Sequence, residues 1–585
     1  MCQTCGCSDA AASAPTRLRN RAEGQWALGY REPLNAAEQN KREDDGLNVR
    51  ERIERIYARK GFASIWPSDL RSRFRWYGIY TQRPETDGYF MMRIRIPGGI
   101  LSAEQTDMIG RISERYGRDI ADVTDRQNIQ LHWIRIEDVP CIWAELESVG
   151  LTTTEACGDT PRNLLGCPLA GVDASEIVDA SLVLQDATAK LVGNPEFSNL
   201  PRKFKISISG CGHACAQHET NDIGLCGARH PRLGAGFDLW VGGGLSTNPM
   251  FAERLGAFVP PERVVPVVLG ITAVFRDWGY RRARNHARMK FLVRDWGSQQ
   301  FRTVLEDEIG YKLDDLDEPP ASAIAHREHV GIWPQKDGNH YAGFSPKAGR
   351  IYGHQLRAVA RLARRYGTGD VRTTTQQKMV ILNVPDERVQ DLAEELEPLD
   401  LPVRSSSFRS GTMACTGIEF CKLAIVETKG RATELYKYLE KVLPGFEEDI
   451  RINVNGCPNS CARYQIADIG LMGCQIVERI HVTDRDGNQV EERRRVEAFL
   501  VHLGGHLGDD RAFGRKARGV RVLASEIGPY IETLIRRYRE RRAQGESFSG
   551  FVNRLSDREL AEFAAKPRYS TAPPAPSALA EPRAS

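Results

Sequence analysis

Two long segments of this chain match each other in order, and this internal repeat constrains the fold more than any other feature. Residues 98–127 and 349–377 both begin with Gly-x-Ile, end a helix-like run in Arg-Tyr-Gly and close on Thr-x-x-Gln. Residues 209–225 and 455–471 then share Gly-Cys-x-x-x-Cys followed by Asp-Ile-Gly-Leu. Because each copy is too long for a solenoid repeat, we expect a duplicated pair of domains rather than an array.

Each copy reads as a small α+β unit followed by a larger one. In the first copy, a glycine-led strand precedes an amphipathic helix over 103–116 and a strand over 129–136. The larger unit has apolar strand candidates at 204–209 and 237–241 and a helical run over 261–277. The expected fold class is therefore α+β, internally duplicated into two pseudo-symmetric halves.

One turn and two tails are also readable. Asp486-Gly487, between two alternating runs, is typical of a hairpin turn. The tail from Lys566 onward is rich in Pro, Ala and Ser, so we expect it to be disordered. The first residues hold a C-x2-C-x-C pattern with no fourth ligand close by, and we assign it no role. Its cysteines are Cys2, Cys5 and Cys7.

Four cysteines of the second copy have the spacing of a metal-cluster site. Cys415 and Cys421 form a C-x5-C pair, and Cys457 and Cys461 follow about 35 residues later. Such thiolates suit an iron–sulfur cluster and favour electron transfer. Zinc is the alternative, although structural zinc sites typically separate paired ligands by only about two to four residues. A disulfide framework needs an oxidising compartment, and no apolar leader follows Met1, so we expect a cytoplasmic protein.

Composition argues against two classes of partner. The chain has 80 Lys and Arg against 77 Asp and Glu, too balanced for nucleic-acid binding through phosphate neutralisation. No stretch approaches the ~18–20 apolar residues of a membrane span. Arginine-rich runs at 281–288 and 536–542 are interpreted as solvated helix faces, with a patch for an acidic protein partner as the alternative. No G-x-G-x-x-G fingerprint is present, so we expect electrons to come from a separate protein.

The first copy replaces part of the cysteine chemistry with cations. Arg162 lies in the stretch equivalent to the first cysteine pair, and Lys203 and Lys205 precede Cys211. Two lysines two residues apart in a strand lie on one face, which is either solvent-exposed or anion-binding. Both interpretations stay open on sequence alone.

The first copy also keeps three cysteines aligned with the last three of the second copy. They are Cys167, Cys211 and Cys215. Pro161 stands where the fourth ligand would be. The trio is interpreted as buried structural thiols, or as a second cluster completed by Cys157 or Cys226. An iron content above that of one cluster and one haem would indicate the second cluster.

From about Gln25 to about Val552 the chain resembles the assimilatory sulfite and nitrite reductases that carry sirohaem and one [4Fe–4S] cluster, especially the ferredoxin-dependent branch. The resemblance rests on the four-cysteine pattern, the duplication and the run Tyr-Phe-Met-Met-Arg-Ile-Arg-Ile-Pro-Gly-Gly at 89–99. It implies two halves, each a ferredoxin-like half-domain plus a larger α+β domain, with sirohaem between them. It also implies ferredoxin as electron donor, a small inorganic anion as substrate and a monomer.

With that architecture, six segments are expected. They are a cysteine-containing flexible tail (1–24), the N-terminal segment with the first ferredoxin-like half-domain (25–150), the first sirohaem and substrate domain (151–325), the second ferredoxin-like half-domain (326–402), the cluster domain (403–555) and a disordered tail (556–585).

The resemblance assigns roles to individual residues. The expected cluster ligands are Cys415, Cys421, Cys457 and Cys461. Cys461 is expected to bridge a cluster iron to the sirohaem iron. The expected substrate-side cations are Arg93, Arg162, Lys203 and Lys205. They would bind an oxyanion and deliver the protons with which its oxygens leave as water. Arg126 and Gln130 fall where the family holds the sirohaem carboxylates.

The choice of substrate depends on one position. Family members dedicated to nitrite tend to place Asn at the end of the Lys-aromatic-X motif, whereas sulfite reductases tend to place Lys. This chain has Lys203-Phe204-Lys205. An extra cation favours the dianion sulfite over the monoanion nitrite. We therefore expect reduction of sulfite to sulfide, with nitrite reduction to ammonia as the alternative.

Overall fold

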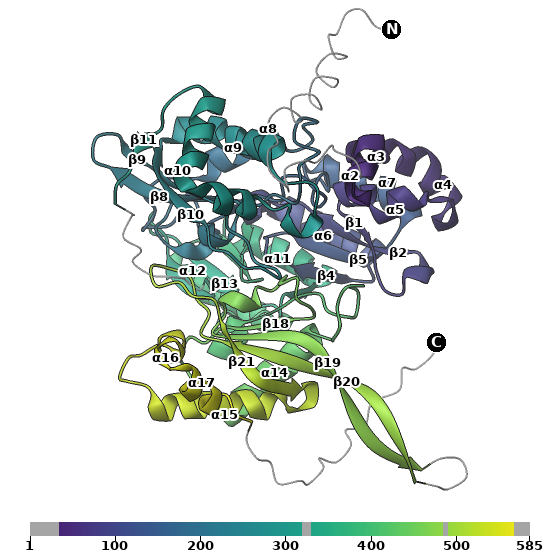
Figure 1. Ribbon diagram of the computed structural model, residues 1–585, viewed down its shortest axis with the longest axis vertical. Helices are drawn as coiled ribbons and strands as arrows, with labels where there is room; N and C mark the ends of the chain where they lie inside the picture. Colours follow the sequence, from purple (N-terminus) through teal and green to yellow (C-terminus); the bar gives the residue numbers. More distant parts are fainter. Residues whose placement is uncertain (1–33, 319–328, 484–488, 567–585) are drawn as a thin grey trace, which may run out of the picture.

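The computed structural model describes residues 34–318, 329–483 and 489–566 (Figure 1). The cysteine-containing tail at 1–24, the predicted turn at Asp486-Gly487 and the part of the predicted disordered tail beyond residue 566 lie outside these residues. The prediction of a disordered tail from residue 556 is wrong at its start, because Asp557–Phe563 form a helix that Ser556 caps. None of the helices in the described segments combines the length and apolar character that a membrane crossing requires.

Two five-stranded sheets form the small units, and each takes an edge strand from the other half. The first sheet has the order β1 (Ile79–Thr81), β2 (Tyr89–Ile94), β5 (Ile129–Arg135), β4 (Ile120–Val123) and β14 (Arg350–Tyr352). The second has the order β12 (Gly331–Pro334), β13 (His340–Phe344), β16 (Met379–Val384), β15 (Asp370–Thr373) and β3 (Ile100–Ser102). β14 pairs with β4 and β3 pairs with β15, both antiparallel. The halves are therefore joined by reciprocal strand exchange.

Equivalent helices of the two copies pack against each other beside these sheets. The prediction of a helix over 103–116 is confirmed by α6 (Ala103–Tyr116), which Ser102 and Gln105 begin with a capping box. Its partner α11 (Gly353–Tyr366) buries Leu356, among other apolar residues. The flanking helices are α2 (Ala36–Glu43), α3 (Val49–Arg52), α4 (Ala58–Lys60), α5 (Pro67–Arg71), α7 (Val139–Ser148) and α12 (Asp386–Leu396).

The larger units are mixed sheets packed against helices. The first is β11 (Asp314–Asp315), β10 (Glu253–Val259), β9 (Gly234–Val241), β8 (Ile223–His230), β7 (Ile206–Ser209) and β6 (Leu165–Gly166), with α8 (Ser181–Leu191), α9 (Val264–Trp278) and α10 (Met289–Ile309). The second is β17 (Thr412–Ala414), β18 (Ile452–Asn455), β19 (Ile469–Thr483), β20 (Gln489–Leu503) and β21 (Arg515–Leu523), with α13 (Ser407–Gly411), α14 (Lys429–Val442), α15 (Ile527–Arg541), α16 (Phe548–Arg554) and α17 (Asp557–Phe563). The duplicated α+β fold is confirmed.

The parallel strands of the second large sheet bring the cysteine loops together. β17 pairs with β18 in parallel through Ala414 and Val454. Cys415 follows β17 directly and Cys457 lies two residues after β18. Because the carboxyl ends of neighbouring parallel strands meet at one edge of a sheet, both loops start side by side.

A buried carboxyl joins the two large units and should make stability depend on pH. Glu219 is 1% exposed and accepts a hydrogen bond of 2.7 Å from the Gly508 N–H, and burial raises its pKa from about 4.5 to about 7. Between a pH of about 4.5 and about 7, folding therefore takes up a proton at Glu219. The stability that the protonated carboxyl contributes is lost as pH rises through about 7. We expect Glu219→Gln to raise the free energy of unfolding by about 1–3 kcal/mol at a pH of about 8 and by much less at about 5. Denaturant unfolding at both pH values measures this, and an equal effect at both would contradict it.

Candidate functional site

The four cysteines of the second copy form one group of free thiols. Cys415 and Cys461 each interact electrostatically with Cys457, which in turn interacts with Cys421. Burial raises the pKa of Cys415 to about 11 and that of Cys461 to about 12, although Cys461 is accessible to solvent. Both are thus neutral thiols until a metal displaces their protons. Within the described residues, no three His, Cys, Asp or Glu side chains converge closely enough to hold a single metal ion.

Backbone and side-chain hydrogen bonds hold the loop after β17, which we call the cluster loop (415–428). The Gly456 N–H donates to the Cys415 sulfur at 3.2 Å, and the Thr428 hydroxyl donates to the Cys415 carbonyl at 2.6 Å. From the first half, the Arg83 guanidinium donates to the carbonyls of residues 421, 422 and 424. Amide N–H groups aimed at a sulfur stabilise its thiolate form, as a cluster ligand requires.

The cations of the first copy face this thiol group. Arg93 donates to the Gln130 side-chain oxygen at 2.8 Å, and Gln130 donates to the Thr416 hydroxyl at 3.2 Å. This chain of hydrogen bonds reaches the residue next to Cys415. The charge of Arg93 also interacts with those of Cys461 and Arg162. Strand β2, which carries Arg93, therefore places a cation against the cluster loop.

Lys203 and Lys205 flank buried Phe204 on the short segment that leads into β7. The strand begins only at Ile206, so the prediction of a strand over 204–209 is wrong at its first two residues. Neither lysine is exposed, and neither ammonium forms a hydrogen bond or ion pair within the described part of the chain. Burial and neighbouring cations lower the pKa of Lys203 to about 8 and that of Lys205 well below its ordinary value. Both side chains are partly buried, so they do not form a fully solvated face, and anion binding stays a prediction.

Arg126 and Arg463 are two of several arginines in the described residues that have a buried guanidinium donor without a hydrogen-bond partner. Arg126 donates to the Asn163 carbonyl at 2.6 Å and to the Asn221 side chain at 3.0 Å, but its Nε has no partner. Arg463 donates through Nη2 to the Thr375 carbonyl, its Nε lies 3.8 Å from the Asp125 carboxylate, and its Nη1 has no partner. Unpaired buried donors are costly. These donors fit a bound polycarboxylate such as sirohaem.

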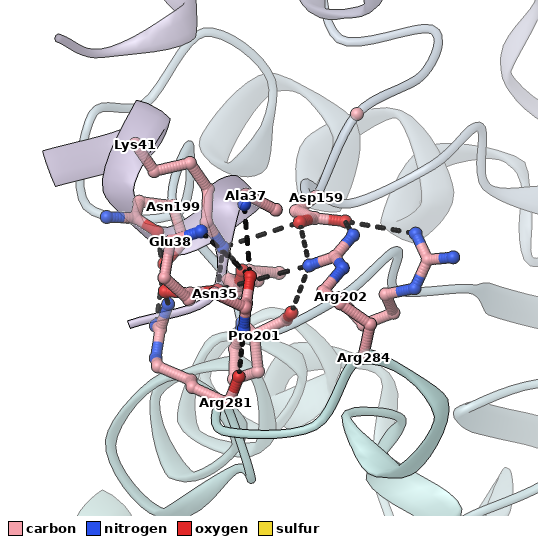
Figure 2. Close-up of polar contacts among 12 residues, drawn as sticks. Asn35, Ala37, Glu38, Lys41, Asp159, Asn199, Pro201, Arg202, Arg281 and Arg284 are labelled. Atoms are coloured by element: carbon pink, nitrogen blue, oxygen red, sulfur yellow. Dashed lines mark hydrogen bonds and ion pairs between the residues drawn. The ribbon is translucent and has the colours of Figure 1, made fainter. Parts of the chain in front are cut away.

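A buried polar network fixes the loops that carry Arg162 and Lys203 (Figure 2). The Asp159 carboxylate pairs with Arg284 at 2.6 Å, and it also lies 3.4 Å from the ammonium of Lys41 on α2. Lys41 also donates to the Leu200 carbonyl at 2.8 Å. The Arg162 N–H donates to the Phe204 carbonyl at 2.7 Å, which joins the two loops.

The run at 281–288 is therefore not the solvated face or acidic-partner patch expected from the sequence. Arg281 is 2% exposed and pairs with Glu38 at 3.1 Å (Figure 2). Arg288 pairs with Asp222 at 2.8 Å. Asp222 also accepts a hydrogen bond from the Lys205 N–H at 2.8 Å. The arginines anchor the loops that carry Arg162 and Lys203, because each meets a buried carboxylate that sequence spacing does not reveal.

The cysteine trio of the first copy is buried as one group, and Ser209 contacts Cys211 at 3.3 Å. Cys167 directly follows β6, which pairs in parallel with β7 as β17 pairs with β18. Cys167 is therefore the counterpart of Cys415. The sequence alignment, which placed Cys167 opposite Cys421 and Pro161 opposite Cys415, is wrong here. The hypothesis of a second cluster stays untested.

Sequence reasoning missed Arg463 and the acidic partner Asp222. Arg463 lies two residues after Cys461, where the first copy has Gln217, and both residues have a positive φ. The replacement of Gln217 by Arg463 between the two copies is the sequence signal that could have identified Arg463. Asp222 belongs to the repeated Asp-Ile-Gly-Leu motif, and its counterpart Asp468 accepts from the Arg451 N–H at 3.0 Å. The repeated aspartate fixes the equivalent segment in both halves.

Comparisons with known proteins cover nearly the whole chain. The family described as nitrite and sulphite reductase 4Fe-4S domain matches residues 157–313 and 405–567. The nitrite/sulfite reductase ferredoxin-like half domain matches residues 82–149 and 333–399.

Individual relatives agree in length as well as in sequence. The sulfite reductase (ferredoxin) of Mycobacterium tuberculosis is 48% identical over 566 residues, covering 93% of this chain and 99% of the relative. The assimilatory ferredoxin-dependent nitrite reductase of Haloferax mediterranei is 36% identical over 552 residues, covering 88% and 91%. The structure of the Mycobacterium tuberculosis NirA protein matches with a TM-score of 0.85 at 47% identity, covering 92% of this chain and all of that one.

Proposed function

The chain belongs to the nitrite and sulphite reductase family, and from that premise we propose that it is a ferredoxin-dependent sulfite reductase. The reaction is the six-electron reduction of sulfite to sulfide. The observation that carries the proposal is the set of cations facing the accessible thiol of Cys461. Lys203 and Arg93 both interact with that thiol, and Arg162 interacts with both cations.

We propose that the four cysteines hold one [4Fe–4S] cluster and that Cys461 also joins the sirohaem iron. Arg126 through Nε and Arg463 through Nη1 would hold sirohaem carboxylates. We propose Gln130, which is hydrogen-bonded to Arg93 and Thr416, as a further residue of this set. When bound, these two cofactors supply the substrate-binding iron and the electrons. The chain's own residues must then bind the anion and deliver protons.

The substrate-side residues divide that work by their chemistry. Arg93 and Arg162 each offer several donors in a rigid planar fork, so they orient the sulfite oxygens. Lys203 has a pKa of about 8, close to neutral pH, and can therefore donate a proton as an oxygen leaves as water. The backbone of Lys205 is fixed by Asp222, so its ammonium is positioned without using up its own donors.

Sulfite is favoured over nitrite on two grounds. The second lysine of the Lys203-Phe204-Lys205 segment adds a cation that attracts a dianion more strongly than a monoanion. The relatives named as sulfite reductases are 48% identical to this chain, against 36% for the Haloferax nitrite reductase. We propose ferredoxin as the donor and a cytoplasmic monomer as the working unit, because both halves of the site lie on one chain.

The pH profile should report Lys203. Its pKa of about 8, lowered by burial and then by Arg288 and Arg162, means that the ammonium loses its charge as pH rises through that value. Because the protonated form binds the anion, kcat/KM for sulfite should be highest below a pH of about 8 and fall above it. In Lys203→Arg, whose side chain stays charged, kcat/KM should no longer depend on pH around a value of about 8. An unchanged alkaline limb in that variant would contradict the assignment.

The function itself is tested with protein expressed alongside sirohaem synthesis. We expect haem absorption bands, and a higher kcat/KM for sulfite than for nitrite with reduced ferredoxin. A clear preference for nitrite would show that Lys205 does not decide the substrate. Absence of haem bands would remove the mechanism.

A further inference from the structure

A two-stranded arm projects from the domain that carries the cysteines. β19 and β20 pair along 15 residues each, whereas β21 pairs with β20 only between Ala498 and Leu503. Outside Ala498 the ribbon has no third strand. Figure 1 shows it reaching away from the body of the molecule. An isolated two-stranded ribbon is only marginally stable in water, so the arm contributes little to the stability of the fold and a role in binding is a better reason for it.

One face of the arm is directed toward the cluster loop. The Cβ direction of Gly473 on β19 points at Val426 and at the Gly456 carbonyl. Across the ribbon, the Glu497 carboxylate accepts a hydrogen bond of 3.0 Å from the Glu427 N–H. Since side chains alternate along a strand, the odd-numbered residues farther out continue this same face.

That face is basic, and the opposite face is not. Its outer part carries Arg479, Arg493 and Arg495 around Val477, which is 60% exposed. Arg479 pairs with Glu491 at 3.4 Å. Arg493 and Arg495 have no ion pair or hydrogen-bonded side-chain partner among residues 34–318, 329–483 and 489–566. On the other face, Arg494 lies between two glutamates, Glu478 and Glu492.

The cluster loop adds an apolar contact and a further cation on its exposed edge. Leu423, two residues after the ligand candidate Cys421, is 60% exposed. Lys422 beside it is 40% exposed and pairs with Glu85 at 2.8 Å. Exposed apolar residues surrounded by cations have the composition of an interface for an acidic protein.

We propose that the basic face of the arm and the exposed edge of the cluster loop together form the docking surface for the acidic iron–sulfur protein that donates electrons. The inference rests on the proposed function and extends it by assigning the arm a role. Docking there places the donor against the loop that holds Cys415 and Cys421. Each encounter then passes a single electron, which oxidises the donor and reduces the enzyme.

The test compares the two faces of the arm in the cofactor-loaded enzyme. Arg493→Glu combined with Arg495→Glu should lower kcat/KM for reduced ferredoxin by about tenfold or more and flatten its dependence on salt. Arg494→Glu, the matched control on the opposite face, should change it by less than about twofold. Equal effects of the two variants would overturn the proposal.

A second variant and a second donor complete the design. Val477→Asp should weaken ferredoxin-driven turnover without any arginine being changed, and normal turnover in that variant would overturn the proposal. Sulfite reduction driven by reduced methyl viologen, which needs no docking surface, should stay at the wild-type rate in every arm variant. Failure of wild-type enzyme with methyl viologen would instead refute the proposed function, so the two failures are distinguishable.

Discussion

Replacing Cys461 with serine should lower sulfite reduction by at least about a thousandfold. Cys461 is the most exposed thiol of the four, and it interacts with Cys415, Cys457 and Lys203. A serine hydroxyl is a poor ligand for iron, whereas a thiolate is a soft one. Loss of the proposed ligand would remove the proposed connection between the cluster and the substrate side. The measurement is turnover with reduced ferredoxin, together with iron content and the visible spectrum.

Cys474→Ser is the matched control for this substitution. Cys474 lies on β19 in the same domain, is partly buried, and interacts with Lys516 and Arg521 rather than with the thiol group. The control should keep both its spectrum and its turnover. A Cys461→Ser protein with wild-type iron content and an unchanged haem spectrum would contradict the proposed role of this thiol.

The repeat in the sequence was sufficient to predict the duplicated α+β fold, because both copies preserve the glycines, helix faces and strand ends that define each unit. The helix over 103–116 was predicted at both ends, since Ser102 is a clear N-cap and Gly117 follows the last apolar position. Strand exchange was not predictable. β3 and β14 have three residues each, and pairing between halves leaves no periodic signal in so short a segment.

The sequence predicted those parts of the candidate site that depend on residue type. It missed the parts that depend on which side chains are buried together. The cysteine pattern identified a thiol group that the structure brings together. The sequence did not show whether Lys203 and Lys205 face solvent or bind an anion, because two lysines on one face of a short extended segment fit both. Arg281 and Arg288 were misread as surface charges, since their partners Glu38 and Asp222 are distant in sequence. Tertiary contact alone turns such charges into structural anchors.

Lys205→Ala should lower kcat/KM for sulfite by at least about a hundredfold, the typical effect of removing one preorganised donor. Lys205 interacts with Arg126, Lys203 and Asp125, and its own ammonium has no protein partner among the described residues. Removing it subtracts one positive charge from the field that attracts the dianion. The loss for nitrite, a monoanion, should be smaller. Steady-state kinetics with both substrates measure the two effects in one preparation.

Lys205→Asn tests whether charge or space determines this selectivity. Asparagine keeps a hydrogen-bond donor but no charge, so sulfite turnover should fall more than nitrite turnover, as with alanine. Lys205 also lies close enough to Lys203 for the two charges to repel each other. Burial and that repulsion lower the pKa of Lys205, whereas burial, Arg288 and Arg162 lower the pKa of Lys203, so the alkaline limb of the sulfite pH profile should stay where it is in the wild type. A merely structural lysine would affect both anions alike, so equal losses for sulfite and nitrite would refute the assignment of substrate choice to Lys205.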